Sequence, residues 1–174
     1  MIRRLPTRVW HLGMPTPDAL LPARVPEDVT VARAAVPVGA MNAFFYTEVG
    51  RDHHWADRLG WRPSQWQAYA ERPSLETWLV HLHGTPAGYA ELDGTHVAMF
   101  GILPALQGHG LGGHLLTEVT RRGWERVRTG AGAGVNGAVV TLDTCELDGP
   151  HALANYRARG YEVLREAVER RARF

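Results

Sequence analysis

At 174 residues the chain has the length of one ordinary globular domain. Its net charge of +1, built from 19 basic residues that are all arginine and 18 acidic residues, gives no broad basic surface. We therefore expect no nucleic acid or anionic membrane as a partner. No apolar run reaches the roughly 18 residues of a membrane span, and the single cysteine, Cys145, excludes an internal disulfide framework. This composition predicts a cytoplasmic protein.

The first part of the chain is rich in proline and shows neither helical nor strand periodicity. We therefore expect residues 1–28 to form an extended arm, followed by one domain at residues 29–174. Alternating β-branched residues at 29–34 predict the first strand of that domain. Residues 38–72 predict two or three short helices. They carry a dense aromatic set, most of which we expect in core packing: Phe44, Phe45, Tyr46, Trp55, Trp61, Trp66 and Tyr69.

An antiparallel meander is predicted next. Residues 76–82 and 87–92 have the character of strands joined by a tight turn. Asp93-Gly94 is a strong signal for a hairpin into a third strand that begins near Thr95.

The third strand leads into a glycine-rich turn that opens a helix. The strand ends at Pro104, and Gly108, Gly110 and Gly112 stand where the helix begins. Without a Cβ atom, these residues let the backbone turn sharply and approach a ligand closely. The unpaired N–H groups of a helix N-terminus favour an anion such as a diphosphate. One face of the predicted helix is apolar, formed by Leu111, Leu115, Leu116, Val119 and Trp124.

The remaining elements complete an α/β pattern. A flexible Gly/Ala loop is expected at 127–137, and a strand at 138–142 should run parallel to the preceding strand because a helix connects them. A helix should begin after 148–150 and end at Gly160, followed by a last strand at 161–164. We expect the arginines beyond it to belong to a polar tail: Arg165, Arg170, Arg171 and Arg173.

Two other phosphate-binding motifs are alternatives to this turn. A Walker A loop requires lysine, which the chain lacks, and is excluded. A dinucleotide-binding module is formally matched by Gly108, Gly110 and Gly113, with Asp143 as a possible ribose-binding acid. The first glycine stands four residues after the strand, and Asp143 lies thirty residues beyond Gly113 instead of about twenty. This alternative stays open.

Two spaced patterns point to a known family. The first follows a strand and reads Gln107-x-x-Gly110-x-Gly112. The second lies downstream and reads Ala152-x-x-x-Tyr156-x-x-x-Gly160-Tyr161. Together they resemble motifs A and B of the GNAT (Gcn5-related) N-acetyltransferases, over residues 29–167.

The resemblance implies a GNAT-like α/β fold: a mixed, mainly antiparallel sheet with splayed parallel central strands, flanked by helices. It implies acetyl-CoA as co-substrate and direct transfer of acetyl to a primary amine on a small molecule or peptide. Homodimers are common in this family. A catalytically silent acyl-CoA sensor is a further alternative.

The resemblance also implies which residues contact the coenzyme. The diphosphate is assigned to the glycine turn and the start of its helix: Gln107, Gly108, His109, Gly110, Leu111, Gly112 and Gly113. Backbone N–H groups at Gly101, Ile102 and Leu103 are expected to hold the pantetheine arm and the thioester, with glycine permitting a bulge and the splaying. Asn155 is a further candidate contact.

Tyr156 occupies the motif B tyrosine and is the candidate general acid for the leaving thiolate; its alternative role is half-buried packing. His96 stands eleven residues before Gln107, where several relatives have glutamate, and its imidazole is the candidate base. An exposed histidine at a hairpin end is the alternative. Glu91 and Asp143 are other candidate bases. No His, Cys, Asp or Glu spacing predicts a metal site.

Overall fold

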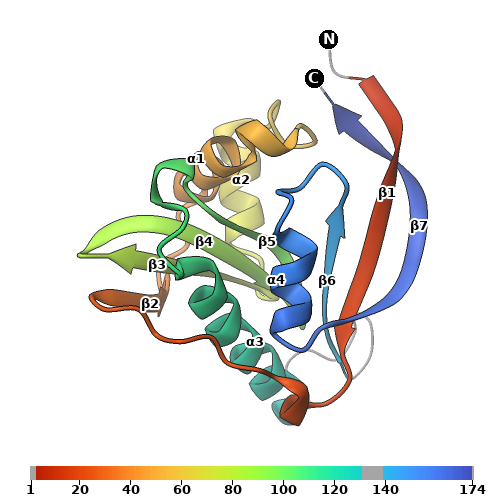
Figure 1. Ribbon diagram of the computed structural model, residues 1–174. Helices are drawn as coiled ribbons and strands as arrows, with labels where there is room; N and C mark the ends of the chain where they lie inside the picture. Colours follow the sequence, from red (N-terminus) through yellow and green to blue (C-terminus); the bar gives the residue numbers. More distant parts are fainter. Residues whose placement is uncertain (1–2, 131–138, 174) are drawn as a thin grey trace.

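The computed structural model describes residues 3–130 and 139–173, which form one sheet with helices on both faces (Figure 1). Its strands are β1 (Arg3–Met14), β2 (Val29–Arg33), β3 (Leu75–Leu82), β4 (Thr85–Asp93), β5 (His96–Ile102), β6 (Val140–Cys145) and β7 (Glu162–Arg173). Its α-helices are α1 (Gly39–Gly50), α2 (Pro63–Ala70), α3 (Leu111–Thr129) and α4 (Ala152–Ala158). Short 3₁₀ turns occur at Pro17–Ala19, Arg51–His53 and Pro104–Leu106.

The seven strands lie in the order β2-β3-β4-β5-β6-β1-β7. Every neighbouring pair is antiparallel except β5 and β6, which run parallel. These two strands pair only at His96 with Thr141 and at Val97 with Leu142, and they diverge beyond that point. The prediction of a mixed, mainly antiparallel sheet with splayed central strands is therefore confirmed.

The structure differs from the expected N-terminal arm. Residues 3–14 form β1, which inserts between β6 and β7. Pro6 suggested an extended arm, but β6 pairs only with Val9–Met14, so Pro6 lies where β1 has β7 alone as a neighbour. A proline is tolerated at such an open edge because no second strand requires its missing N–H. In Figure 1, β1 and β7 extend together past the other strands of the sheet.

Other elements follow the prediction with shifted ends. The β3–β4–β5 meander, the helices of residues 38–72 and the short helix before Gly160 are present. Helix α3 continues to Thr129, into the expected 127–137 loop. Residues 131–137 of that loop and residue 138 of the expected next strand lie outside the described part of the chain. The expected polar tail is also wrong, because those arginines belong to β7, which pairs with β1 along its length.

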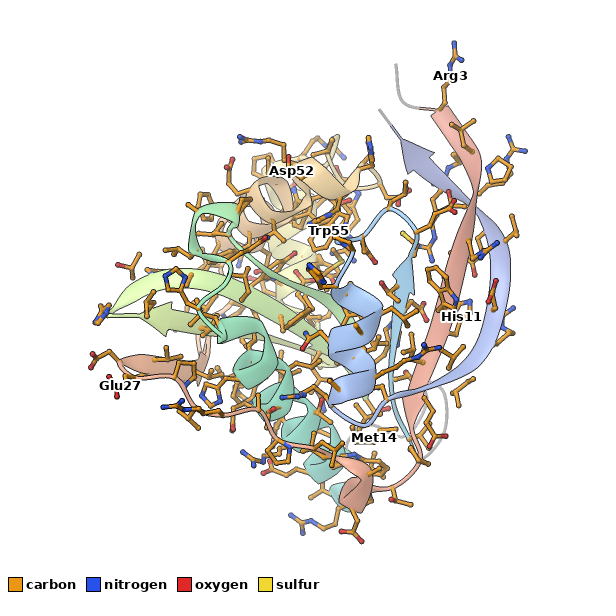
Figure 2. All side chains as sticks on the ribbon, viewed as in Figure 1. Arg3, His11, Met14, Glu27, Asp52 and Trp55 are labelled. Carbon is orange, nitrogen blue, oxygen red and sulfur yellow. The ribbon has the colours of Figure 1, made fainter. Side chains whose placement is uncertain are left out.

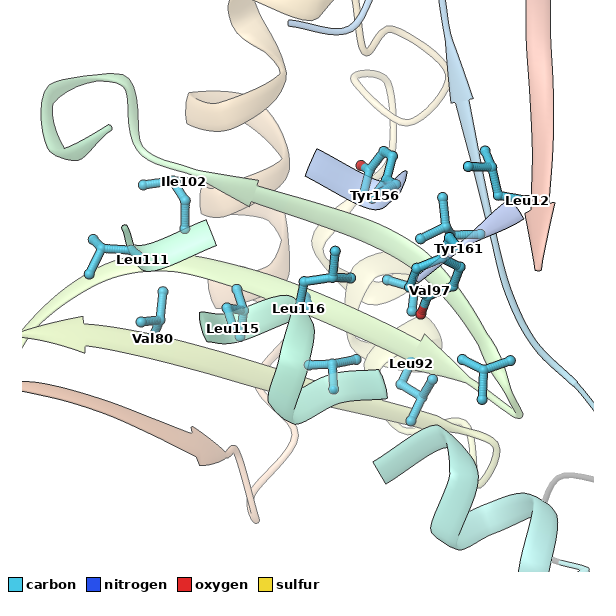
Figure 3. Packing of buried hydrophobic residues seen from close by; sticks show 14 of the residues in the cluster. Leu12, Val80, Leu92, Val97, Ile102, Leu111, Leu115, Leu116, Tyr156 and Tyr161 are labelled. Carbon is cyan, nitrogen blue, oxygen red and sulfur yellow. The ribbon is translucent and has the colours of Figure 1, made fainter. Parts of the chain in front are cut away.

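The main core lies between the sheet and α3 (Figure 3). Leu111, Leu115, Leu116 and Val119 of α3 are each at most 1% exposed, as their shared face predicts. Burying one such side chain stabilises the fold by about 1.5–3 kcal/mol. They pack on alternate residues of β4, β5 and β6, whose side chains therefore face α3 and α4: Ala90, Leu92, Val97, Ile102, Val140 and Leu142.

The opposite face of the sheet is covered by α1 and α2. Phe45 stacks on Tyr89 of β4 with ring centroids 5.1 Å apart, and Tyr46 and Trp66 form a second aromatic cluster with Met99 of β5 at its edge. The expected aromatic core is thus largely present. Phe44 is the clear exception, because its side chain is exposed.

Candidate functional site

A cavity of about 720 Å³ lies where β5 and β6 diverge. Its walls come from the glycine turn and the start of α3, from α4, from the facing edges of β5 and β6, and from the loop between α1 and α2. The separation of the two strands thus opens a path between the two faces of the sheet.

The glycine turn forms one end of this cavity. Gly108 and Gly110 have φ values of +84° and +75°, a left-handed conformation that strains other residues. Gly110 is the N-cap of α3, so the N–H groups of Leu111, Gly112 and Gly113 have no partner within the helix. No other residue in the described part of the chain accepts a hydrogen bond from them. These amides are available to an anion.

Of the two helical glycines, Gly113 is closely packed, because a Cβ there would lie only 3.0 Å from the Cβ of Ala23. A Cβ on Gly112 would lie 3.6 Å from the Phe100 ring, which is an ordinary contact distance. Gln107 anchors the turn, because its Nε2 donates to the carbonyl oxygen of Ile102 at 3.3 Å. The cradle is therefore fixed against the end of β5.

The edge of β5 presents backbone donors to the gap. The Leu103 N–H donates to Ala87 at 2.8 Å within the sheet, so it is already used. Hydrogen bonds alternate along an antiparallel strand, so the N–H groups of Ile102 and Phe100 point to the diverging β6. Of the predicted coenzyme contacts, Asn155, Gly101, Ile102 and every residue of the turn except His109 line the cavity, and Leu103 does not.

Glycine at position 101 is explained by helix packing and not by the expected bulge. The bulge of β5 lies at Ala98, since Glu91 pairs with Met99 and Leu92 pairs with Val97. A Cβ on Gly101 would lie only 2.2 Å from Cγ1 of Val49. Glycine at this position therefore lets α1 pack directly on β5.

Tyr156 reaches the cavity from α4. Its side chain is 7% exposed, and its ring meets Phe100 edge-on with centroids 6.0 Å apart. Burial raises the pKa of Tyr156, so its hydroxyl keeps its proton at neutral pH. Asn155 lies beside the start of α3, because a Cβ on Gly113 would be 3.9 Å from its Oδ1. The second pattern in the sequence thus lies beside the first.

Neither candidate base on the meander lines the cavity among the described residues. Nδ1 of His96 lies 2.9 Å from Oγ1 of Thr141, and burial lowers the pKa of His96. Glu91 is fully buried on the α1/α2 face. It accepts hydrogen bonds from Asn42 at 2.8 Å, Tyr69 at 2.5 Å and Arg58 at 3.1 Å. Glu91 is therefore the buried counterion of Arg58.

Arg58 is a residue of the cavity wall that sequence reasoning missed. It lies in the loop between α1 and α2, with its guanidinium 4.3 Å from the ring centroid of Tyr69 and 5.2 Å from that of Trp61. Cation–π contact and the Glu91 carboxylate hold it in place. The only signal in the sequence was an arginine within an aromatic segment.

Asp143, the other candidate base, does line the cavity, and Cys145 follows it on β6. The side chain of Asp143 contacts His11 of β1, with Nδ1 2.7 Å from Oδ1. Residues 3–14 were expected outside the domain, so the sequence analysis missed His11. Within residues 3–130 and 139–173, no three His, Cys, Asp or Glu side chains form a group able to hold a metal ion. No described helix has the length and apolar character needed to cross a membrane.

Comparison with known proteins gives a family match. The model of the acetyltransferase (GNAT) family matches residues 40–161. No curated protein matches the chain.

Solved structures match over nearly the whole chain. A GCN5-related N-acetyltransferase from Kribbella flavida is 22% identical, with a TM-score of 0.63, over 96% of this chain and 58% of that one. One from Sphaerobacter thermophilus is 16% identical, with a TM-score of 0.65, over 98% and 53%. A tandem GNAT protein from the clavulanic acid biosynthesis pathway is 15% identical, with a TM-score of 0.57, over 96% and 54%. At these identities the likeness establishes the fold, and the chain spans just over half the length of these proteins.

Proposed function

Because the chain belongs to the acetyltransferase (GNAT) family, we propose that it transfers acetyl from acetyl-CoA to the primary amine of a small molecule or peptide. The observation that carries this proposal is the set of unpaired amides at the start of α3, which opens into the gap between β5 and β6. A diphosphate fits the unpaired amides, and a thin extended arm fits the gap between the strands.

The residues fit the parts of the coenzyme. The N–H groups of Leu111, Gly112 and Gly113, which have no partner within the helix, would hold the diphosphate at the start of α3. The N–H groups of Phe100 and Ile102 would hold the pantetheine arm and the thioester carbonyl at the gap. When bound, the coenzyme supplies an acetyl group already activated as a thioester.

Tyr156 would give its proton to the departing thiolate, since burial keeps that hydroxyl protonated. Direct transfer is favoured over a covalent enzyme intermediate. Cys145 lines the cavity, but burial raises the pKa of its thiol, which disfavours the thiolate needed for attack.

Thermal unfolding with acetyl-CoA or NADH tests the binding half of this proposal. A ligand at 100 times its Kd stabilises the folded state by about 2.7 kcal/mol. For a chain of this length, that raises the Tm by about 5–10 °C. Protection by NADH and not by acetyl-CoA would favour the dinucleotide-binding alternative.

Release of free coenzyme A thiol, measured with a panel of primary amines, tests the chemical half. We expect at least one amine to stimulate release above the rate with water alone, with the acetylated amine detected by mass spectrometry. Protection by acetyl-CoA without stimulation by any amine would favour the silent sensor.

A further inference from the structure

The cavity joins the two faces of the sheet, and each face carries different chemistry. Tyr156 and Phe100 lie on the face covered by α3 and α4, as does Leu142 of β6. Side chains alternate along a strand, so Asp143 points to the opposite face, where Tyr46, Trp55 and Arg58 line the cavity. Asp143 is also the first residue of β6 after its last pair with β5. It therefore lies at the opening between the strands, on the side away from α4.

Three aspartates line the cavity, and two of them are committed elsewhere. Asp57 pairs with Arg4 at 2.9 Å. Asp148 accepts hydrogen bonds from Oγ1 of Thr144 at 2.6 Å and from the Cys145 N–H at 2.9 Å, which closes the turn after β6.

Like these two, Asp143 uses one of its two oxygens, but its partner is a histidine on the neighbouring strand. His11, labelled in Figure 2, lies opposite it on β1, and its Nδ1 is 2.7 Å from Oδ1 of Asp143. No residue in the described ranges donates to Oδ2. The Asp143 side chain is 36% exposed, compared with 22% for His11. His11 thus holds Oδ1 of the carboxylate and leaves Oδ2 available on the cavity side.

The groups around this pair come from two strands, β5 and β7. On β7, Oε1 of Glu169 and Nη2 of Arg165 lie 2.9 Å and 2.8 Å from Nε2 of His11. On β5, His96 is close enough for its pKa to respond to both Asp143 and His11, although burial has the largest effect and lowers it. On β7, Arg171 pairs with Glu169 at 2.9 Å. His11 thus has a carboxylate on each ring nitrogen, which favours a donated hydrogen bond to Asp143.

We propose that Asp143 receives the ammonium group of the acceptor and removes its proton, with His11 as the residue that positions the carboxylate. This inference rests on the proposed transferase function. One N–H proton of the ammonium passes to Oδ2 of Asp143. The freed lone pair on nitrogen forms the C–N bond with the thioester carbonyl carbon. The C–S bond breaks, and the thiolate takes the Tyr156 proton. The acylated nitrogen still carries one proton in excess, and this proton passes through water to the Tyr156 phenolate, which restores Tyr156. Asp143 then loses its proton to water.

The test compares Asp143→Asn with Asp52→Asn, an exposed aspartate that does not line the cavity. For D143N we expect amine-dependent kcat/KM to fall about 100-fold or more, with the acetyl-CoA Kd unchanged. The rise of kcat/KM with pH, which reports deprotonation of the base in wild type, should disappear. D52N should match wild type in each measurement, and D143E should recover part of the rate.

His11→Gln gives a second measurement that does not depend on D143N being folded. Because His11 acts through Asp143, we expect kcat to fall about tenfold and the pH profile to shift, while the acetyl-CoA Kd and the Tm stay close to wild type.

A wild-type enzyme that acetylates amines, together with a folded D143N of equal kcat/KM and an unchanged pH profile, would overturn this inference and leave the proposed function standing. If D143N does not fold, an H11Q variant with wild-type kcat and pH profile would overturn it equally. A wild type that binds acetyl-CoA without acetylating any amine would remove both proposals.

Discussion

Replacing Glu91 with glutamine removes a negative charge from the buried network beneath the cavity while keeping the shape of the side chain. Glu91 is 0% exposed, and the side chain of its partner Arg58 is 18% exposed, with 3.1 Å between Nη1 and Oε2. Burial and then the Glu91 charge raise the pKa of Tyr69, which donates to the same oxygen. In the variant, the Arg58 guanidinium keeps its aromatic neighbours but loses its counterion.

The expected loss of stability follows from this burial. Removing one partner of a buried ion pair costs about 3–5 kcal/mol, because the other charge stays desolvated. The remaining exposure of Arg58 favours the lower end, about 3 kcal/mol. For a chain of this length, that corresponds to a Tm about 6–12 °C lower. Adding Arg58→Met should recover part of the loss, since no uncompensated charge then stays buried.

Urea unfolding of E91Q, the double variant and a control measures this directly. The control is Glu48→Gln, which breaks the exposed pair with Arg51, whose side chains are 35% and 65% exposed; it should cost about 0.5 kcal/mol or less. If E91Q were as stable as E48Q, the Glu91–Arg58 ion pair would not stabilise the fold, and this reasoning would be refuted. A loss of turnover of about 100-fold in such a stable E91Q variant would support Glu91 as the base.

Four further variants or conditions test other parts of the structure. Tyr156→Phe should lower kcat by about 10²–10⁴-fold with an unchanged acetyl-CoA Kd; equal turnover would exclude it as the acid. Gly110→Ala should cost about 1–2 kcal/mol, because its φ is +75°, and should weaken acetyl-CoA binding in calorimetry. Leu116→Ala, at a fully buried position, should cost about 2–5 kcal/mol in urea unfolding. Burial raises the pKa of Tyr161 above the value of about 10 in the unfolded chain. Unfolding therefore releases that proton above about pH 10, so stability should fall as the pH rises, and less steeply in Tyr161→Phe.

The parts of the fold that sequence reasoning predicted are those with a local signal. Alternating residues and the Asp93-Gly94 turn gave the meander, and the apolar face of α3 gave the helix and its core contacts. Strand β1 had no such signal, because its partners are distant in sequence and Pro6 argued against a strand. Only the pairing with β6 and β7 shows that this proline lies at an open edge.

The predicted placement of the site residues also holds best where the sequence signal is local. The glycine turn and Tyr156 belong to short patterns whose geometry is set within a few residues. His96 was placed by counting back from Gln107, and a count does not detect the bulge at Ala98, which exchanges the two faces of β5 upstream of it. Glu91 looked available on a strand, but only the packing of α1 and α2 reveals Asn42, Tyr69 and Arg58 around its carboxylate.

The insertion of β1 between β6 and β7 also bears on how the chain folds during its synthesis. His11 meets a partner 132 residues later, and Arg4 meets one 166 residues later. At about 5–20 residues per second, a ribosome needs roughly 7–30 s to make the intervening chain. Throughout that time the first strand has both hydrogen-bonding edges unsatisfied, while the meander can already form. We therefore expect cotranslational folding of this sheet to finish with the capture of β1, after β6 and β7 have been made, and chaperones to bind β1 until then.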